Sequence, residues 1–173
     1  GLDWTQTSPH LPRESAVHAY VATALAASVT TNVCDGVGTP MPFEVLGAEF
    51  IDGAELARDL AARELPGVRF QETAFRPFYG RFAGRTLYGV RLLIDDPAAF
   101  EPVRTALAFL VSLRNLYPEE LALADEATNA KHWGNELVLT LLAEGRSELA
   151  IHSSWQGDVQ RFALDREKFL IYD

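Results

Sequence analysis

The sequence contains a single cysteine, Cys34, in 173 residues. One thiol excludes a disulfide within the chain and any zinc site built from cysteines. The four histidines show no ligand spacing such as His-x-x-x-His, so we expect no metal and no cofactor. No apolar run is long enough for a membrane span, and the first residues lack the pattern of a signal peptide.

Positive charge is also scarce. Fifteen Lys and Arg residues face 24 Asp and Glu residues, which gives a formal net charge of -9 and a pI of about 4.9. Such a chain has no basic surface with which to replace phosphate counterions, so nucleic acid is excluded as a partner, and so is an anionic lipid surface. An uncharged ligand, or one held by a few arginines, remains compatible with the composition.

Length and composition indicate one globular domain with a single sizeable core, because 48% of the residues are hydrophobic and 23% are charged. Residues 1–12, which include Pro9 and Pro12, are predicted to form a linker or extended segment, and residues 13–173 a single domain. The opening "GLDWTQTSPHLP" has no initiator Met and no strand or helix pattern, so we expect the chain to be part of a longer protein.

Helices are predicted over most of the domain. The spacing of apolar residues predicts helices at 13–28 and 53–65, and a third from Asp96-Pro97 to about residue 116. "WGNELVLTLLAEG" predicts another, whereas the preceding "ALADEATNAKH" is polar and irregular. Ser147 would cap a last helix. Two helical stripes are apolar, one carrying Val17, Tyr20, Val21, Ala24 and Leu25, the other Ile151, Trp155, Val159 and Phe162.

Strands are fewer. "PFEVLGAEFID" suggests one or two short strands around Gly47, and residues 68–75 and 86–95 each predict a longer one. The fold class is therefore α+β, a small β-sheet packed against several α-helices, with helices in the majority.

The first candidate site is the loop "TNVCDGVGTPMPFE", residues 31–44, hereafter the first loop. It has neither a lysine after its glycines nor a following helix, so it is not a phosphate-binding loop. Two interpretations stay open. Gly36 and Gly38 allow backbone shapes that expose N–H groups, and with Asn32, Asp35 and Thr39 they suit a hydroxyl-rich ligand. Alternatively, Asn32 and Asp35 satisfy the loop's own backbone in a turn.

Glu44 ends this loop and enters an apolar strand. Together with Asp35 it could form the carboxylate pair that glycoside chemistry requires. The alternative is an exposed carboxylate on a strand.

The second candidate site is "RPFYGRFAGRT", residues 76–86, hereafter the second loop, which is too long for a tight hairpin turn. Its aromatic residues could stack on a sugar ring, and its arginines could hold a carboxylate. Alternatively, the aromatic residues fill the core and the arginines are solvated. We favour the core for Phe78 and Phe82, and retain Arg76 and Tyr79 as candidates for ligand binding.

Several segments carry a family resemblance. "TSPHLP", "TNVCDGVGTPMPFEVLGAEFIDG", "LPGVRF", "FRPFYGRFAG", "YGVRLLIDD", "FEPVRTALAFL" and "LYPEE" occur in this order. Together, and with the tail "LLAEGRSELAIHSSWQGDVQRFALDREKFLIY", they resemble the C-terminal domain of the NamZ (YbbC-like) exo-β-N-acetylmuramidases over nearly the whole chain.

The resemblance implies a bacterial glycoside hydrolase that removes N-acetylmuramic acid from peptidoglycan fragments, working outside the cytoplasm. It implies an N-terminal Rossmann-like domain of the same protein as partner, carrying the catalytic glutamate, while the domain described by these residues closes the substrate cleft. No catalytic residue is therefore assigned to this chain. The alternative is a carbohydrate-binding or protein-interaction module without activity, or a domain that only braces another.

Matches to the family pattern fall mainly in the first loop, at Thr31, Asn32, Gly36, Gly38, Thr39, Pro42, Phe43 and Glu44. Cys34 stands for the usual serine and Val37 for an arginine, while Arg81 replaces a lysine and Phe82 a tyrosine. If the chain forms a substrate cleft, the two loops should meet, and Asn32, Glu44, Arg76 and Tyr79 should expose their polar ends there.

Overall fold

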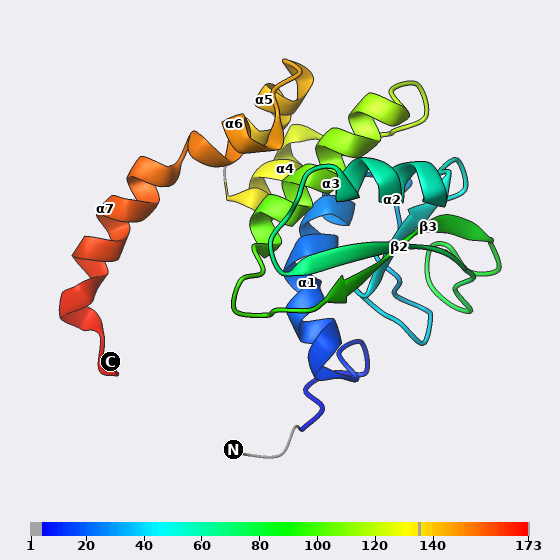
Figure 1. Cartoon of the computed structure of the whole chain (residues 1–173), viewed down its shortest axis with the longest axis horizontal. Helices are drawn as coiled ribbons and strands as arrows, with labels where there is room; N and C mark the ends of the chain where they lie inside the picture. Colours follow the sequence, from blue (N-terminus) through cyan, green and yellow to red (C-terminus); the bar gives the residue numbers. More distant parts are fainter. Residues whose placement is uncertain (1–4, 135, 173) are drawn as a thin grey trace.

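The computed structural model describes residues 5–134 and 136–172, with residues 1–4 of the predicted linker outside this range. It is an α+β fold, as the sequence predicts, with a small sheet and helices in the majority (Figure 1). The elements are α1 (Glu14–Ser28), β1 (Val45–Ala48), α2 (Gly53–Ala61), β2 (Val68–Phe75), β3 (Leu87–Ile94), α3 (Pro102–Leu116), α4 (Glu126–Trp133), α5 (Leu137–Ala143), α6 (Glu148–Ser153), α7 (Gln156–Arg166) and the 3-10 turn η1 (Glu167–Phe169).

The sheet has three antiparallel strands in the order β1-β3-β2. β2 and β3 pair along their full length, from Val68 opposite Ile94 to Phe75 opposite Leu87. Both strands match their predicted ranges, and the region around Gly47 forms the single strand β1. The second loop joins β2 to β3, so its position is fixed by the end of this hairpin.

Glycines let β1, β3 and the start of α2 lie close together. Gly47 of β1 lies opposite Gly89 of β3. A Cβ at Gly89 would lie 2.1 Å from the carbonyl oxygen of Leu46, and one at Gly53 would lie 2.6 Å from the carbonyl oxygen of Gly89. Since real Cβ atoms do not approach so closely, these positions require glycine. The absence of side chains there sets the spacing between α2, β1 and β3.

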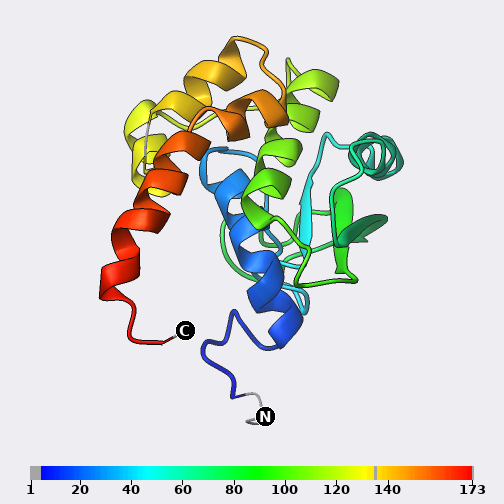
Figure 2. The same cartoon turned by 60° about the vertical axis from the view of Figure 1, so that its left-hand side comes forward.

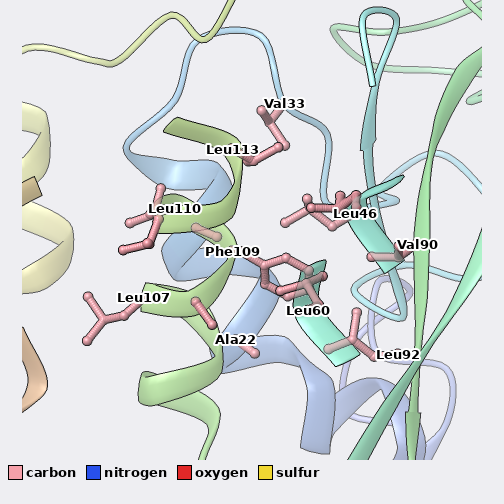
Figure 3. Close-up of a cluster of buried hydrophobic side chains, with 14 of the residues drawn as sticks. Ala22, Val33, Leu46, Leu60, Val90, Leu92, Leu107, Phe109, Leu110 and Leu113 are labelled. Atoms are coloured by element: carbon pink, nitrogen blue, oxygen red, sulfur yellow. The ribbon is translucent and has the colours of Figure 1, made fainter. Parts of the chain in front are cut away.

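The core lies on both sides of α3. Phe109 points toward Leu60 of α2 and toward the sheet residues Leu46 and Leu92 (Figure 3). Leu107 and Leu110 point the opposite way, and α6 packs against α3. Burying each such side chain contributes about 1.5–3 kcal/mol to folding. In Figure 2, α1 and α3 lie between the sheet and the group formed by α4, α5 and α6.

Helix α1 forms where the sequence predicts it, but its bulky apolar face is not the face that enters the core. The residues that are fully or almost fully buried are small: Ala16, Ala19, Ala22, Thr23 and Ala26. Val17, Tyr20 and Val21 are exposed by 36–44%. Alanine side chains allow α1 and α3 to approach closely, because little volume separates their backbones, and this packing turns the larger side chains outward.

The helices differ from the prediction at several points; α2 ends at Ala61 and α5 begins at Leu137, so both are shorter than predicted. The third helix begins at Pro102, not at Asp96, because the Asp96 carboxylate accepts hydrogen bonds from the amides of Ala98 and Ala99 and closes a separate turn. The segment expected to be irregular forms α4, whose first turn is capped by Asp125 through the amide of Thr128.

The last predicted helix is two helices, α6 and α7. Ile151 is buried, but Val159 and Phe162 are exposed, so the predicted apolar stripe enters the core only at its beginning. From residue 156 onward the chain extends away from the body of the molecule (Figure 1), and residues 156–172 are called the C-terminal arm below. Within the described residues, no helix is both long and apolar enough to cross a membrane.

Candidate functional site

The two candidate loops meet, as the sequence predicts. The amide of Phe78 donates a hydrogen bond of 2.9 Å to the carbonyl oxygen of Gly38. At Gly38, whose φ is +92°, a Cβ would lie 2.5 Å from the carbonyl oxygen of Tyr79. The backbones of the loops are therefore in direct contact, and the glycine allows that contact.

An open cavity of about 570 Å³ lies beside this contact. One wall is the outward face of α1, and the opposite wall comes from both loops. Its lining residues are Tyr20, Val21, Ala24, Leu25, Ala27, Ser28, Val33, Cys34, Asp35, Phe43, Arg81, Phe82 and His132. The side chains that α1 turns away from the core are thus the ones that form the cavity, and its volume suits a small ligand such as a sugar unit.

Aromatic rings shape the cavity. The rings of Tyr20 and Phe43 meet edge to face, with centroids 4.7 Å apart. The guanidinium carbon of Arg81 lies 5.2 Å from the centroid of Phe82, within the range of a cation–π contact. Phe82 packs on a small apolar cluster that includes Val45, but it is only partly buried and also lines the cavity, so the expectation that it joins the core is confirmed only in part.

Polar groups in the cavity are few. Arg81 is the cation, Asp35 is the carboxylate, and His132 adds an imidazole from α4. Burial raises the pKa of Asp35, although the amide of Val37, 3.2 Å from Oδ1, acts in the opposite direction. The cavity therefore combines apolar walls with one positive and one acidic side chain.

The backbone of Cys34 is hydrogen-bonded to Gly47, and its thiol is unreactive. Its amide donates to the carbonyl oxygen of Gly47 at 2.8 Å, and its carbonyl accepts from the amide of Gly47 at 3.0 Å. Burial raises the pKa of its thiol to about 11. The thiol is thus protonated at neutral pH and is not a nucleophile, in agreement with the sequence, in which no cation neighbours it.

Asn32 braces the first loop against another segment. Its side-chain amide donates to the carbonyl oxygen of Glu120 at 2.6 Å, and its Oδ1 accepts from the amide of Ala122 at 3.1 Å. Both ends of the side chain therefore satisfy backbone groups about 90 residues away in sequence. The expectation that Asn32 presents a free polar end to the cavity is wrong.

Gly36 and Thr39 serve the turn itself. Gly36 has a φ of +83°, and a Cβ there would lie 2.6 Å from a side-chain carbon of Val45. The Thr39 hydroxyl donates to the carbonyl oxygen of Gly36 at 2.7 Å and accepts from the amide of Met41 at 3.0 Å. These residues shape the loop that carries Asp35 to the cavity, and neither lines it.

Glu44 is a buried carboxylate that pairs with two partly exposed arginines, not an exposed strand carboxylate. It is 3% exposed, and its Oε1 accepts from Nε of Arg13 at 2.9 Å and from the hydroxyl of Ser15 at 3.2 Å. Its Oε2 accepts from Arg91 at 3.2 Å. The expected exposed polar end is therefore wrong, because these three partners hold the carboxylate. Glu44 does not line the cavity with Asp35, and the pairing of the two carboxylates stays a prediction.

Arg76 and Tyr79 are exposed, as predicted, but neither lines the cavity. The ring of Tyr79 stacks on His10, with centroids 5.9 Å apart, and Phe78 meets it edge to face. Phe78 is 72% exposed, so its predicted place in the core is wrong. Binding of a ligand by Arg76 and Tyr79 stays a prediction.

Sequence reasoning missed Tyr20, Phe43, Arg81 and His132 as neighbours of Asp35. They come from α1, both loops and α4, and no spacing along the chain connects them. One signal was available: a helix with an alanine face and a bulkier apolar face offers two surfaces, and the bulkier one can be left for a ligand. Among the described residues, no cluster of His, Cys, Asp or Glu could hold a metal ion.

Comparison with known proteins gives consistent matches. Residues 18–172 match the family model described as "Exo-beta-N-acetylmuramidase NamZ, C-terminal". The chain is 34% identical over 171 residues to the peptidoglycan beta-N-acetylmuramidase NamZ of Bacillus subtilis (strain 168), which covers 99% of this chain and 41% of that protein.

A solved structure shares the fold. The crystal structure of a DUF1343 family protein from Bacteroides fragilis NCTC 9343 matches with a TM-score of 0.72 and 23% identity. The match covers 100% of this chain and 46% of that one. The chain thus spans less than half the length of both of these relatives.

Proposed function

Because the chain belongs to the family of NamZ exo-β-N-acetylmuramidase C-terminal domains, we propose that it forms one wall of the substrate cleft of a bacterial glycoside hydrolase acting on peptidoglycan fragments. The observation that carries the proposal is the cavity between α1 and the two loops, with its aromatic walls and single cation. We also propose that the enzyme acts outside the cytoplasm, where peptidoglycan lies.

The lining residues suit an acidic sugar. A sugar ring has apolar faces that pack on aromatic side chains, here Tyr20 and Phe82, and a rim of hydroxyls that a carboxylate such as Asp35 can accept from. N-acetylmuramic acid also carries a carboxylate. The guanidinium of Arg81 is the lining group that can bind it, by charge-assisted hydrogen bonds. Arg81 would thus replace the cation that the first loop lacks at Val37.

Catalysis requires a further carboxylate. Glycosidases use two, about 5–5.5 Å apart in retaining enzymes and about 6.5–9.5 Å apart in inverting enzymes. Asp35 is the carboxylate among the lining residues, and Glu44 is occupied by its three partners. We therefore propose, as the family resemblance implies, that the catalytic glutamate lies in another part of the full-length protein and that these 173 residues alone do not turn over substrate.

The test uses the product of the whole gene and a chromogenic N-acetylmuramic acid glycoside. Arg81→Ala should raise KM about 10-fold or more, since a hydrogen bond to a charged group contributes about 1.5–3 kcal/mol. It should change KM little for the N-acetylglucosamine analogue, which lacks the acid. Arg69→Ala is the matched control, because Arg69 is an exposed arginine that pairs with Asp95 and does not line the cavity.

Two results would contradict the proposal. The first is an Arg81→Ala enzyme that still prefers the acidic sugar as strongly as the parent does. The second is enzyme-like turnover by the isolated 173 residues, which would place the catalytic group inside this chain.

A further inference from the structure

The C-terminal arm exposes large apolar side chains. No residue of α7 is buried, and Phe162 is 65% exposed. The segment that follows is more open still, with Ile171 and Tyr172 each 83% exposed. An exposed run of this kind on a globular protein marks an interaction surface.

Several apolar residues of α7 lie along one side of the helix, whereas Leu164, which is 70% exposed, lies on the opposite side. Trp155, Val159 and Phe162 follow each other at helical spacing, and Ala163 completes the stripe. Trp155 is partly buried against the core and begins this stripe. Asp158 and Asp165 flank the stripe, and Arg161 lies beyond them toward the opposite side; all three are exposed. The arm therefore continues an apolar surface outward from the core, and its charged residues face solvent.

Charge argues against a lipid surface. The described arm has three acidic residues and three basic ones (Asp158, Asp165 and Glu167; Arg161, Arg166 and Lys168). Arg161 is further neutralised by Asp158, with N and O 2.7 Å apart. Amphipathic helices that bind anionic membranes carry an excess of Lys and Arg on the polar face. Helix α7 has no such excess, because its two arginines are matched by two aspartates.

Both relatives are much longer than this chain. The family match runs to residue 172, so the arm is part of the domain common to the family. The chain accounts for only 41% of the Bacillus subtilis relative and 46% of the Bacteroides fragilis one. More than half of each relative is thus available as a surface on which the arm can pack.

We propose that the C-terminal arm, through Val159, Phe162 and residues 169–172, packs against the second domain that the longer relatives carry. The proposal rests on that second domain, which the proposed function also requires, but not on any activity. The arm starts at a small cavity lined by Leu25, His132 and Trp155, and two of these residues, Leu25 and His132, also line the main cavity. A domain held by the arm would therefore stand beside the main cavity.

The experiment compares hydrogen exchange in the product of the whole gene and in the isolated 173 residues. Peptides within 156–172 should exchange at least 10-fold more slowly in the longer protein, whereas peptides from α3, which is in the core of both, should not differ. Phe162→Asp should abolish this protection, and Gln160→Asp, the same charge placed off the stripe, should leave it in place.

Three results would overturn the proposal: equal exchange of the arm in both proteins, a gene that encodes these 173 residues alone, or a dimer of the isolated chain, seen by light scattering, that Phe162→Asp dissociates. The last result would make a second copy the occupant. Equal exchange of the arm in the two unmutated proteins, together with normal selectivity of the longer protein for the acidic sugar, would refute this inference and leave the proposed function standing.

Discussion

Substitution of Glu44 tests whether this residue stabilises the fold or binds the ligand. Its carboxylate is 3% exposed and accepts hydrogen bonds from Arg13, Ser15 and Arg91. If these contacts hold the first loop to α1 and β3, Glu44→Gln should destabilise the fold without creating a cavity, since the two side chains have nearly the same volume.

The magnitude follows from the partners. A hydrogen bond to a charged group contributes about 1.5–3 kcal/mol when buried, but the arginine side chains are 47% and 38% exposed, so solvent weakens each pair to about 1 kcal/mol or less. With the Ser15 contact added, we expect a loss of about 2–3 kcal/mol in the free energy of unfolding. For a chain of this size the melting temperature should fall by about 4–12 °C.

The assay is urea unfolding followed by circular dichroism, with calorimetry for the melting temperature. Glu49→Gln is the control, because Glu49 pairs with Arg85 and is half exposed, and it should change stability little. A Glu44→Gln protein as stable as the parent but weakened in sugar binding would refute the reasoning and return Glu44 to the substrate site.

Three further predictions concern packing and pH. Gly38→Ala should cost about 1–3 kcal/mol, because its Cβ would meet the carbonyl oxygen of Tyr79; Gly134→Ala, at a positive φ in open space, should cost less in the same urea titration. The pKa of the Cys34 thiol is raised from 9.0 to about 11, so the protonated thiol should contribute about 3 kcal/mol to stability below pH 9, and this contribution should be lost as pH rises through 11. When the free energy of unfolding is measured from pH 8 to 11, it should fall less steeply for Cys34→Ala than for the parent. The same pH dependence in both proteins would contradict the assignment. Phe109→Ala should destabilise by about 3–5 kcal/mol, and a smaller loss by calorimetry would mean that the core around it can collapse.

The strands and the ends of several helices were predictable because local signals determine them. Residues 68–75 combine β-branched and aromatic residues with turn residues on both sides, and β2 occupies that range. The end of α3 follows from Tyr117-Pro118, since the residue before a proline avoids the helical region. In α4, by contrast, a single Asp125 cap starts a helix that its weak apolar pattern does not reveal.

The candidate site was predicted only in part, for a physical reason. Polar loop residues such as Asn32 and Glu44 can serve a ligand or the protein itself, and only their partners decide which. Those partners lie 29 to 90 residues away in sequence, beyond the reach of any local pattern. The meeting of the two loops was expected from the substrate-cleft hypothesis and is observed. The part played by α1 was not predicted, because the bulkier apolar face was taken as the core face although the smallest residues pack inward.

Helix α1 thus separates two tasks between its sides. Substitution of Ala19 or Ala22 would disturb the fit with α3, whereas Tyr20 and Val21 can change size while the core stays intact. A lineage could therefore remodel the wall of its ligand pocket through this helix without first acquiring a compensating gain in stability.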